Sequence, residues 1–382
     1  TAGLAAGALA LSKFSAVLLP PIALILIGLR LARRAPLRTG PRRVGGLARL
    51  FVLAGAGVGA AIVAIALLWA AYGFRFSAAG RNAPEGARFF HTWEEVLLNP
   101  SREAGMVMAD GTREEPTLME PGIVQHFVRW ARVRRVLPEA WLHGLAYVDV
   151  SARYRPAFFA GEWRATGWWN FFPVAYLTKS TWGELALHAL GLAVLIVAAR
   201  DRRGRALLYR AAPLLVFVAV YGAFSLGSSL NIGHRHILPL YAAAAVLAGV
   251  ALSRHTTALV RLIGVVALLA HVVASLATRP DYLAYFNAFA GGAPGAHRYF
   301  ADSSLDWGQD LPRLARWLEN VPAEERVYLS YFGTADPTHA GLRVYRIGDT
   351  FSDARPRHLL RRWRGGWLVI SATMWQRVYT QV

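Results

Sequence analysis

Six apolar segments dominate this sequence, and each is long enough, or nearly long enough, to cross a bilayer. They lie at roughly 4–29, 50–72, 182–199, 211–228, 236–253 and 259–277. A hydrocarbon core of about 30 Å requires roughly 20 apolar residues in a helix. Lipid offers no partner to backbone N–H and C=O groups, so an isolated apolar segment can cross it only as a helix. The sequence therefore predicts a mostly α-helical, polytopic membrane protein.

The composition agrees with a membrane protein and narrows the range of partners. Of the 382 residues, 55% are hydrophobic, and the mean hydropathy is +0.33, which is too apolar for an ordinary soluble domain. The chain has no cysteine, so its fold depends on neither disulfides nor thiolate metal sites. The net charge of +19 could indicate nucleic acid, but the arginines gather in linkers between apolar segments. That distribution is typical of contact with membrane lipids, and we expect no nucleic acid partner.

The basic linkers predict how the chain is oriented in the membrane. Every second linker is short and rich in arginine, namely 30–49, 200–210 and 254–261. The positive-inside rule places these linkers in the cytoplasm. The regions then expected outside are the loop 73–181, the turn 231–235 and the tail 278–382.

The first apolar segment has two interpretations. Lys13 and the pair Pro20-Pro21 interrupt it. It is either one span over 4–29 or a short re-entrant piece at residues 3–12 followed by a span from Phe14. In both cases Lys13 lies at a helix boundary or in a polar cavity.

The long outer loop contains two stretches suited to a membrane interface. A loop of this length is more than a connector. Residues 121–136 combine apolar side chains with arginines in the pattern of an amphipathic helix that lies in the membrane interface. Residues 158–179 are dense in aromatic side chains, and an interfacial belt is predicted for Trp163, Trp168, Trp169, Phe171 and Phe172. An aromatic belt does not explain the charged Glu162, Arg164 and Lys179 among these rings.

The tail from about Asp281 is typical of a small α/β domain. A helix is predicted to begin with Asp306 as N-cap and Gln309 at N3, and to run to about Leu318. Strands are predicted at 326–332, 343–347 and 366–371. Their alternation with helices favours a parallel sheet. We expect a transmembrane module over 1–279 and an extracytoplasmic α/β domain over 280–382.

The turn Asn231–Pro239 (NIGHRHILP) is the strongest candidate for a ligand site. A lipid phosphate is a suitable partner for charges at the edge of a membrane. Arg235 can bind it through two parallel hydrogen bonds, with His234 and His236 beside it. Alternate side chains of a tight turn rarely face one way, so one histidine is expected to be structural, and His236 is favoured as the site residue. Lys179 is expected at the same membrane face, where it could contact the same phosphate. The alternative for both cations is an interfacial anchor.

Three further sets of polar residues could form sites. Glu162 and Arg164 could bind sugar or acceptor hydroxyls, or pair with each other. His297, His339 and Asp302 have a spacing that fits no compact metal site. Asp302, Asp306 and Asp310 form a carboxylate cluster in sequence, although Asp306 is explained more simply as a helix N-cap.

Four strings in this order resemble bacterial membrane glycosyltransferases of the protein-mannosyltransferase and aminoarabinose-transferase type, glycosyltransferase family 39 of the GT-C superfamily. They are Leu9–Pro20 (LALSKFSAVLLP), Ala160–Lys179 (AGEWRATGWWNFFPVAYLTK), Asn231–Pro239 (NIGHRHILP) and Asp302–Leu311 (DSSLDWGQDL). The resemblance implies a GT-C-like helical bundle in the inner (plasma) membrane of a bacterium. It also implies inverting transfer of a sugar from a polyprenyl-phosphate carrier to a lipid, glycan or protein acceptor outside. Such transfer usually needs no metal, and we expect no cofactor.

The same resemblance leaves the catalytic base unassigned. In the family an acidic residue in the first outer loop acts as the base or positions the reacting groups. The chain begins at Thr1 within an apolar stretch, so we interpret it as truncated at the N-terminus, with the catalytic acid expected before residue 1. Asp149 and Glu162 lie on the predicted outer side, but no motif supports either of them. The competing functions are a transporter or flippase for a lipid-linked sugar and a non-catalytic binder of it; a transporter would be expected to have pseudo-symmetric halves, which the sequence lacks.

Overall fold

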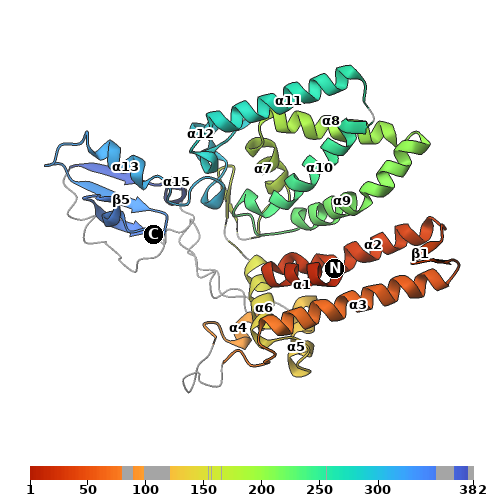
Figure 1. The fold of residues 1–382 in the computed structure, drawn as a ribbon. Helices are drawn as coiled ribbons and strands as arrows, with labels where there is room; N and C mark the ends of the chain where they lie inside the picture. Colours follow the sequence, from red (N-terminus) through yellow and green to blue (C-terminus); the bar gives the residue numbers. More distant parts are fainter. Residues whose placement is uncertain are drawn as a thin grey trace. The chain divides into compact units, whose positions relative to one another are not determined.

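The computed structural model is mostly helical, with a small parallel sheet towards the C-terminus (Figure 1). It describes residues 1–79, 89–98, 121–153, 155, 157–164, 166–254, 256–349 and 365–376. The chain separates into two compact units. The first comprises Thr1–Gly105, Glu115–Tyr154 and Ala198–Phe224, and the second comprises Met106–Glu114, Arg155–Val197 and Ser225–Val382. The predicted division at residue 279 lies inside the second unit and stays a prediction.

The predicted multi-span architecture is confirmed. Among the described residues, five helical segments are long and apolar enough to cross a membrane: Phe14–Ala32, Ala48–Ala71, Arg202–Leu226, His234–Ser253 and Ala258–Ala277. The pair α7 (Phe171–Lys179) and α8 (Trp182–Ala198) makes a sixth if the two count as one span, although they meet at an angle of 115°. These helices are typical of a multi-pass membrane protein.

The N-terminal segment of the first unit is broken at Lys13, as one of the two interpretations predicted. Helix α1 (Ala2–Ser12) ends there, and a 3₁₀ turn (Phe14–Leu18) leads into α2 (Leu19–Ala32). A single span over 4–29 is therefore wrong. Helix α1 instead packs against α3 (Ala48–Ala71). The two helices are so close that a Cβ added at Gly3 would lie only 2.6 Å from the Cβ of Val63.

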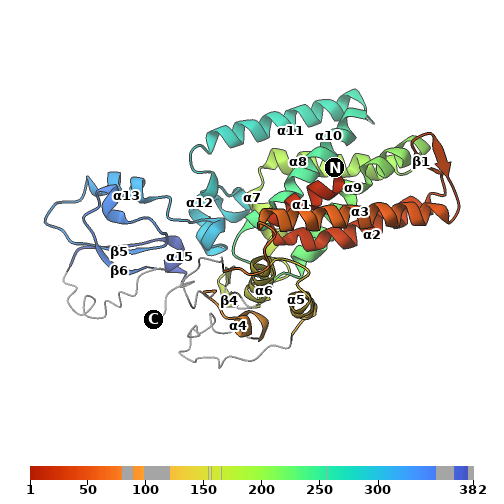
Figure 2. The ribbon, with the colours of Figure 1, turned by 60° about the horizontal axis from the view of Figure 1, so that its bottom comes forward.

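Helices α2 and α3 lie side by side and are joined by a short hairpin (Figures 1 and 2). Its strands are β1 (Leu37–Thr39) and β2 (Arg42–Val44), which pair antiparallel. The predicted arginine linker 30–49 is thus a β-hairpin between two candidate spans. Helix α9 (Arg202–Leu226) also belongs mainly to this unit.

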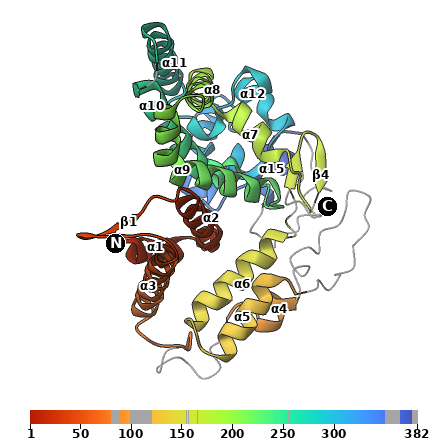
Figure 3. The same cartoon turned by 90° about the vertical axis from the view of Figure 1, so that its right-hand side faces the viewer.

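Three shorter helices of the first unit pack on one another (Figure 3). They are α4 (Trp93–Leu98), α5 (Ile123–Val133) and α6 (Glu139–Arg153). Helix α5 confirms the helix predicted at 121–136, but its apolar residues divide between two faces. Val128 and Ala131 are fully buried in this cluster, whereas Ile123 and Trp130 are exposed. Of the long loop, residues 80–88 and 99–120 lie outside the described residues.

In the second unit, α8 packs closely on α10 (Leu238–Arg254) and α11 (Ala258–Ala277) through glycine. A Cβ added at Gly183 would lie 2.2 Å from the carbonyl oxygen of Ala267 on α11. One added at Gly191 would lie 2.6 Å from the Cα of Ala248 on α10. Glycine therefore sets the interhelical distance at both contacts. His255, part of the predicted linker 254–261, lies outside the described residues.

An aromatic core forms around the start of α7, and it shows that the predicted interfacial belt is wrong for two of its five residues. Phe171 and Phe172 are only 1% and 4% exposed, so they pack in this core and are not available to an interface. Phe159 joins them from the hairpin of β3 (Ala157–Phe159) and β4 (Glu162–Arg164), and Phe300 from the tail. Trp169 remains exposed. Edge-to-face and tilted contacts between aromatic rings stabilise a core beyond the burial of their area.

The predicted parallel sheet is confirmed. Its strand order is β6 (Tyr345–Asp349), β5 (Val327–Tyr331), β7 (Trp367–Ile370), and both pairings are parallel. Strand β5 is central and completely buried. Helix α13 (Leu311–Leu318) packs on it through Leu311 and Leu314.

The predicted start of α13 is wrong. The helix begins at Leu311, with Asp310 at the N-cap position, although it ends at Leu318 as expected. Asp306 lies four residues earlier, where its carboxylate accepts hydrogen bonds from the backbone N–H groups of Gly308 (2.9 Å) and Thr373 (3.3 Å). A contact with a residue 67 positions away thus replaces the expected helix cap.

Short helical turns complete the tail. They span Tyr282–Ala284, Ala288–Ala290, Gly292–Gly295 (α12), Ala296–Arg298, Asp302–Ser304, Pro337–Ala340 and Ala372–Trp375 (α15).

Candidate functional site

The structure brings the turn Asn231–Pro239 against the loop Asp302–Leu311, 70 residues away in the chain. The turn forms a 3₁₀ helix, His234–Ile237, that leads directly into α10. The backbone N–H of His234 donates to the hydroxyl of Ser304 (3.2 Å), and the hydroxyl of Ser303 donates to the carbonyl of Ile232 (2.8 Å). Gly233 permits this contact, because a Cβ there would lie 2.2 Å from the Ser303 hydroxyl. Two of the four recognised strings are therefore parts of one local structure.

Arg235 is the exposed charged side chain of this turn. Its guanidinium carbon lies 5.1 Å from the ring centroid of Trp307, within the range of a cation–π contact. In the part of the chain that the structure describes, no carboxylate forms an ion pair with Arg235. The Trp307 ring therefore supports the guanidinium without neutralising it, which leaves its five N–H donors for an anion.

Lys179 lies beneath the same loop and is buried. Its ammonium donates to the carbonyls of Leu283 (2.7 Å) and Ser304, and lies 4.2 Å from the ring centroid of Phe286. Since Ser304 also accepts from His234, this single serine joins Lys179 to the turn. The observed contacts of Lys179 are with the protein, and its binding of a phosphate stays a prediction.

The two histidines face the protein, while Arg235 between them is exposed. The ring of His234 lies 6.3 Å from that of Tyr241, and the ring of His236 lies 6.4 Å from that of Phe172. The Nδ1 atom of His234 is buried and has no hydrogen-bond partner among the described residues. The preference for His236 over His234 as a ligand stays a prediction.

Glu162 and Arg164 contact each other on β4. Their side chains form an ion pair with an Nη2–Oε2 distance of 2.6 Å, and both are exposed. Arg164 also lies over the ring of Trp168, 5.4 Å from its centroid. Their predicted role towards a sugar or acceptor stays a prediction. Asp149, the other carboxylate considered as a base, is engaged by Arg153 (2.7 Å) and Gln125 (2.6 Å).

No metal centre is indicated in the described ranges. No group of three or more His, Asp or Glu side chains there could hold a metal ion. Asp302 is buried, and its carboxylate accepts from the backbone N–H of Ser303 (2.5 Å). His297 contacts the carbonyl of Pro294 through Nδ1 (2.8 Å).

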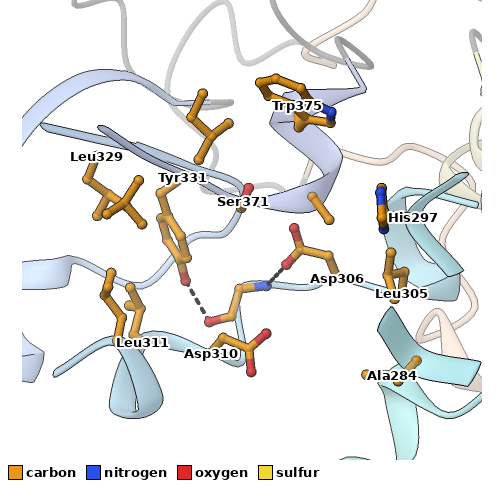
Figure 4. A pocket seen from close by; sticks show the side chains of 16 residues that line it. Ala284, His297, Leu305, Asp306, Asp310, Leu311, Leu329, Tyr331, Ser371 and Trp375 are labelled. Carbon is orange, nitrogen blue, oxygen red and sulfur yellow. Dashed lines mark hydrogen bonds between the residues drawn. The ribbon is translucent and has the colours of Figure 1, made fainter. Parts of the chain in front are cut away.

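Sequence reasoning missed a cavity of about 520 Å³ at the carboxyl ends of β5 and β7 (Figure 4). Tyr331 at the end of β5, Ser371 directly after β7 and Trp375 on α15 line it, together with Asp306 and Asp310 from the loop. The pattern of parallel strands could have indicated it, because ligands of such sheets bind beyond the carboxyl ends of the strands. Which loops close the cavity depends on long-range contacts that the sequence does not reveal.

The two aspartates of this cavity differ in their surroundings. Both oxygens of Asp306 already accept backbone N–H groups. Asp310 accepts no hydrogen bond as an N-cap. Partial burial raises the pKa of Asp310, and the neighbouring carboxylates of Asp306 and Asp281 act in the same direction against Arg313.

A second cavity of about 520 Å³ lies among α8, α10 and α11. Its walls are mainly apolar, with Glu184, His188 and His271 among them. His188 Nδ1 contacts the hydroxyl of Tyr176 (2.7 Å), and His271 Nδ1 contacts that of Thr181 (2.8 Å). These polar groups belong to the candidate spans, where ionisable side chains are costly.

The comparisons with known proteins add no relative. The chain matches no protein-family model, and searches of curated proteins and of solved structures return no match.

Proposed function

We propose that this protein is a membrane glycosyltransferase that moves a sugar from a polyprenyl-phosphate carrier to an acceptor on the outer face of a bacterial inner membrane. The observation that carries the proposal is the junction of the turn Asn231–Pro239 with the loop Asp302–Leu311. The junction leaves Arg235 exposed at the end of a candidate membrane span, with an aromatic ring behind it. The resemblance of these strings to glycosyltransferase family 39 favours the same function.

A lipid-phosphate donor needs a cation where charge develops on the leaving group. As the bond between sugar and phosphate breaks, negative charge accumulates on the phosphate oxygens, and a guanidinium held there stabilises the transition state. Arginine suits this role because its planar fork matches two phosphate oxygens. The proposal assigns this role to Arg235, with Lys179 and His234 fixing the turn from below through Ser304. The residue that activates the acceptor is not assigned.

The test is sugar transfer by the purified full-length gene product, which would include the expected catalytic acid, in liposomes that contain a polyprenyl-phosphate sugar labelled in the sugar. The acceptor is a bacterial envelope extract. The proposal expects label to move from the carrier to the extract. Arg235→Lys should lose one charge-assisted hydrogen bond, worth about 1.5–3 kcal/mol, which lowers turnover roughly 10- to 150-fold. Arg316→Lys is the matched control, because Arg316 is an exposed arginine of the same unit on α13.

Each competing function has its own outcome in this assay. Carrier that crosses the bilayer intact, with no loss of its sugar, would indicate a flippase and overturn the proposal. Carrier that binds without transfer or movement would indicate a non-catalytic binder. Unchanged turnover in Arg235→Ala would show that this arginine is only an interfacial anchor.

A further inference from the structure

The cavity beside β5 and β7 lies where open parallel sheets bind ligands. The two strands are hydrogen-bonded neighbours, and their carboxyl ends lead to Tyr331 and Ser371 in its wall. In such sheets the loops beyond the carboxyl ends form the ligand site. The volume of about 520 Å³ is within the usual range for small-molecule sites.

The charge of this cavity is opposite to that of the chain. The whole sequence has 42 Lys and Arg against 23 Asp and Glu, yet the described side chains that line the cavity include Asp306 and Asp310 and no Lys or Arg. Carboxylates repel phosphate and accept hydrogen bonds from hydroxyls. A neutral ligand with several O–H donors therefore fits better than an anion.

The hydrogen-bonding groups around the cavity remain partly available. Asp310 makes no cap hydrogen bond, and within the described part of the chain no donor occupies its carboxylate oxygens, which can therefore accept from a ligand. The hydroxyl of Tyr331 donates to the carbonyl of Gly308 (2.8 Å), which leaves its lone pairs to accept. The hydroxyl of Ser371 accepts from the N–H of Phe332 (3.0 Å), which leaves its own proton to donate. Figure 4 shows Asp306, Tyr331 and Ser371 arranged around the same space.

Trp375 supplies an apolar surface for the same ligand. It lines the cavity, yet 63% of its surface is exposed. Its place at the edge of the cavity is visible in Figure 4. An exposed indole face is well suited to the C–H face of a pyranose, while the hydroxyls of that ring bond to carboxylates. A flat aromatic surface beside carboxylates is thus a chemical match for a sugar.

One short loop joins this cavity to the turn that holds Arg235. Ser304 contacts His234, while Asp306 lines the cavity two residues later. Two residues of chain span at most about 7 Å. The next residue, Trp307, lies against Arg235. A sugar in the cavity would therefore lie near a phosphate on Arg235.

We propose that this cavity binds a neutral sugar unit of the acceptor, with Trp375 as the stacking surface and Asp310 as the acceptor of its hydroxyl hydrogen bonds. The assignment to the acceptor rests on the proposed function. The binding of a sugar does not, because it follows from the lining of the cavity alone.

The experiment measures binding of soluble glycosides in the absence of any lipid-linked donor. The full chain in nanodiscs is titrated with methyl glycosides of a neutral hexose, an N-acetylhexosamine and a pentose, and saturation-transfer NMR reports contact. At least one glycoside is expected to bind at millimolar concentration, and a hexose 6-phosphate is expected to bind at least tenfold more weakly. Trp375→Ala and Asp310→Asn should each weaken binding at least fivefold.

Matched controls separate the cavity from the general surface. Trp367→Ala removes a half-exposed tryptophan on β7 outside the cavity, and Asp336→Asn neutralises an exposed aspartate elsewhere in the tail. Both should bind as the unaltered protein does. The proposal is overturned if the unaltered protein binds no glycoside, or if Asp310→Asn binds as well as the unaltered protein. If the thermal unfolding of Asp310→Asn differs from that of the unaltered protein, Trp375→Ala takes its place in this comparison.

The outcome is distinguishable from that of the glycosyltransferase proposal. If glycosides bind at Trp375 and Asp310 but no sugar is transferred, the sugar site stands and the proposed function fails. If transfer depends on Arg235 but its KM for acceptor is unchanged in Trp375→Ala and Asp310→Asn, the proposed function stands and the acceptor site fails. If both hold, these two variants should raise the KM for acceptor about tenfold with a smaller change in kcat.

Discussion

Asn287 is predicted to hold the bend between α7 and α8, where Lys179 is located. It is only 4% exposed, and its side-chain amide donates to the carbonyls of Leu177 (2.7 Å) and Ser180 (2.9 Å). Its Oδ1 accepts from the N–H of Phe289 (3.0 Å). The last carbonyls of a helix have no partner within the helix, so a side chain that satisfies two of them fixes where the helix ends.

Replacing Asn287 by alanine removes all three of these side-chain hydrogen bonds. Each is worth about 0.5–1.5 kcal/mol net, and a buried carbonyl left without a partner costs about 1–3 kcal/mol. If water reaches one of the two carbonyls or the N–H left without a partner, the free energy of unfolding should fall by roughly 2–4 kcal/mol. Asn320→Ala is the matched control, because its amide contacts the carbonyls of Arg316 and Trp317 at 3.4 Å on the surface. That change should cost no more than about 0.5 kcal/mol.

The assay is denaturant-induced unfolding in mixed micelles, followed by tryptophan fluorescence. Hydrogen exchange should show faster exchange at the C-terminal end of α7 in Asn287→Ala and not in Asn320→Ala. The reasoning is refuted if the two variants lose the same stability, since packing of the aromatic core alone would then hold the bend.

Three further predictions concern pH, helix packing and topology. Burial lowers the pKa of His143 from its ordinary value of 6.5, despite its contact with the carbonyl of His91. The stability that the neutral ring provides is therefore present above pH 6.5 and is lost as the pH falls through the lowered pKa. The melting temperature of the unaltered protein should drop more steeply below pH 6.5 than that of His143→Gln. Gly183→Ala places a methyl group against the backbone of α11 and should cost about 1–3 kcal/mol in thermal unfolding, whereas Gly249→Ala, with open space around it inside α10, should cost nothing and should add up to about 1 kcal/mol through helix propensity. Single cysteines at Arg38 and Glu319 in this cysteine-free chain should be labelled by an impermeant reagent from opposite sides of the membrane, and labelling from the same side would contradict the orientation predicted from the arginine linkers.

The sequence alone determined the membrane helices and the strands of the tail. Hydropathy is a local property, and the bilayer imposes one length on every segment that crosses it, so each span could be predicted without its neighbours. The strand Val327–Tyr331 was recognisable for a similar reason, because a short apolar run between turn signals is typical of a buried strand. The break at Lys13 was only one of two interpretations of that apolar segment, and the structure decided between them.

Only the tertiary structure decided what the polar and aromatic residues contact. Asp306, with Gln309 three residues later, fits the sequence pattern of a helix N-cap, yet its carboxylate accepts a hydrogen bond from the backbone N–H of Thr373. Phe171 and Phe172 have the sequence of an interfacial belt, yet a ring from Phe300 helps to bury them. The environment of a side chain is set by residues far away in the chain, and local propensity carries no information about them.

The same reason explains which part of the candidate site could be predicted. Arg235 was recognisable because its charge beside an apolar span is itself a local signal. The partner loop and the cavity beside β5 and β7 were not, because both are formed by chain segments 23 to 70 residues apart. Hydrogen bonds such as those of Ser304 and Tyr331 form only when the whole unit has folded, so the geometry that makes these residues a site belongs to the tertiary structure.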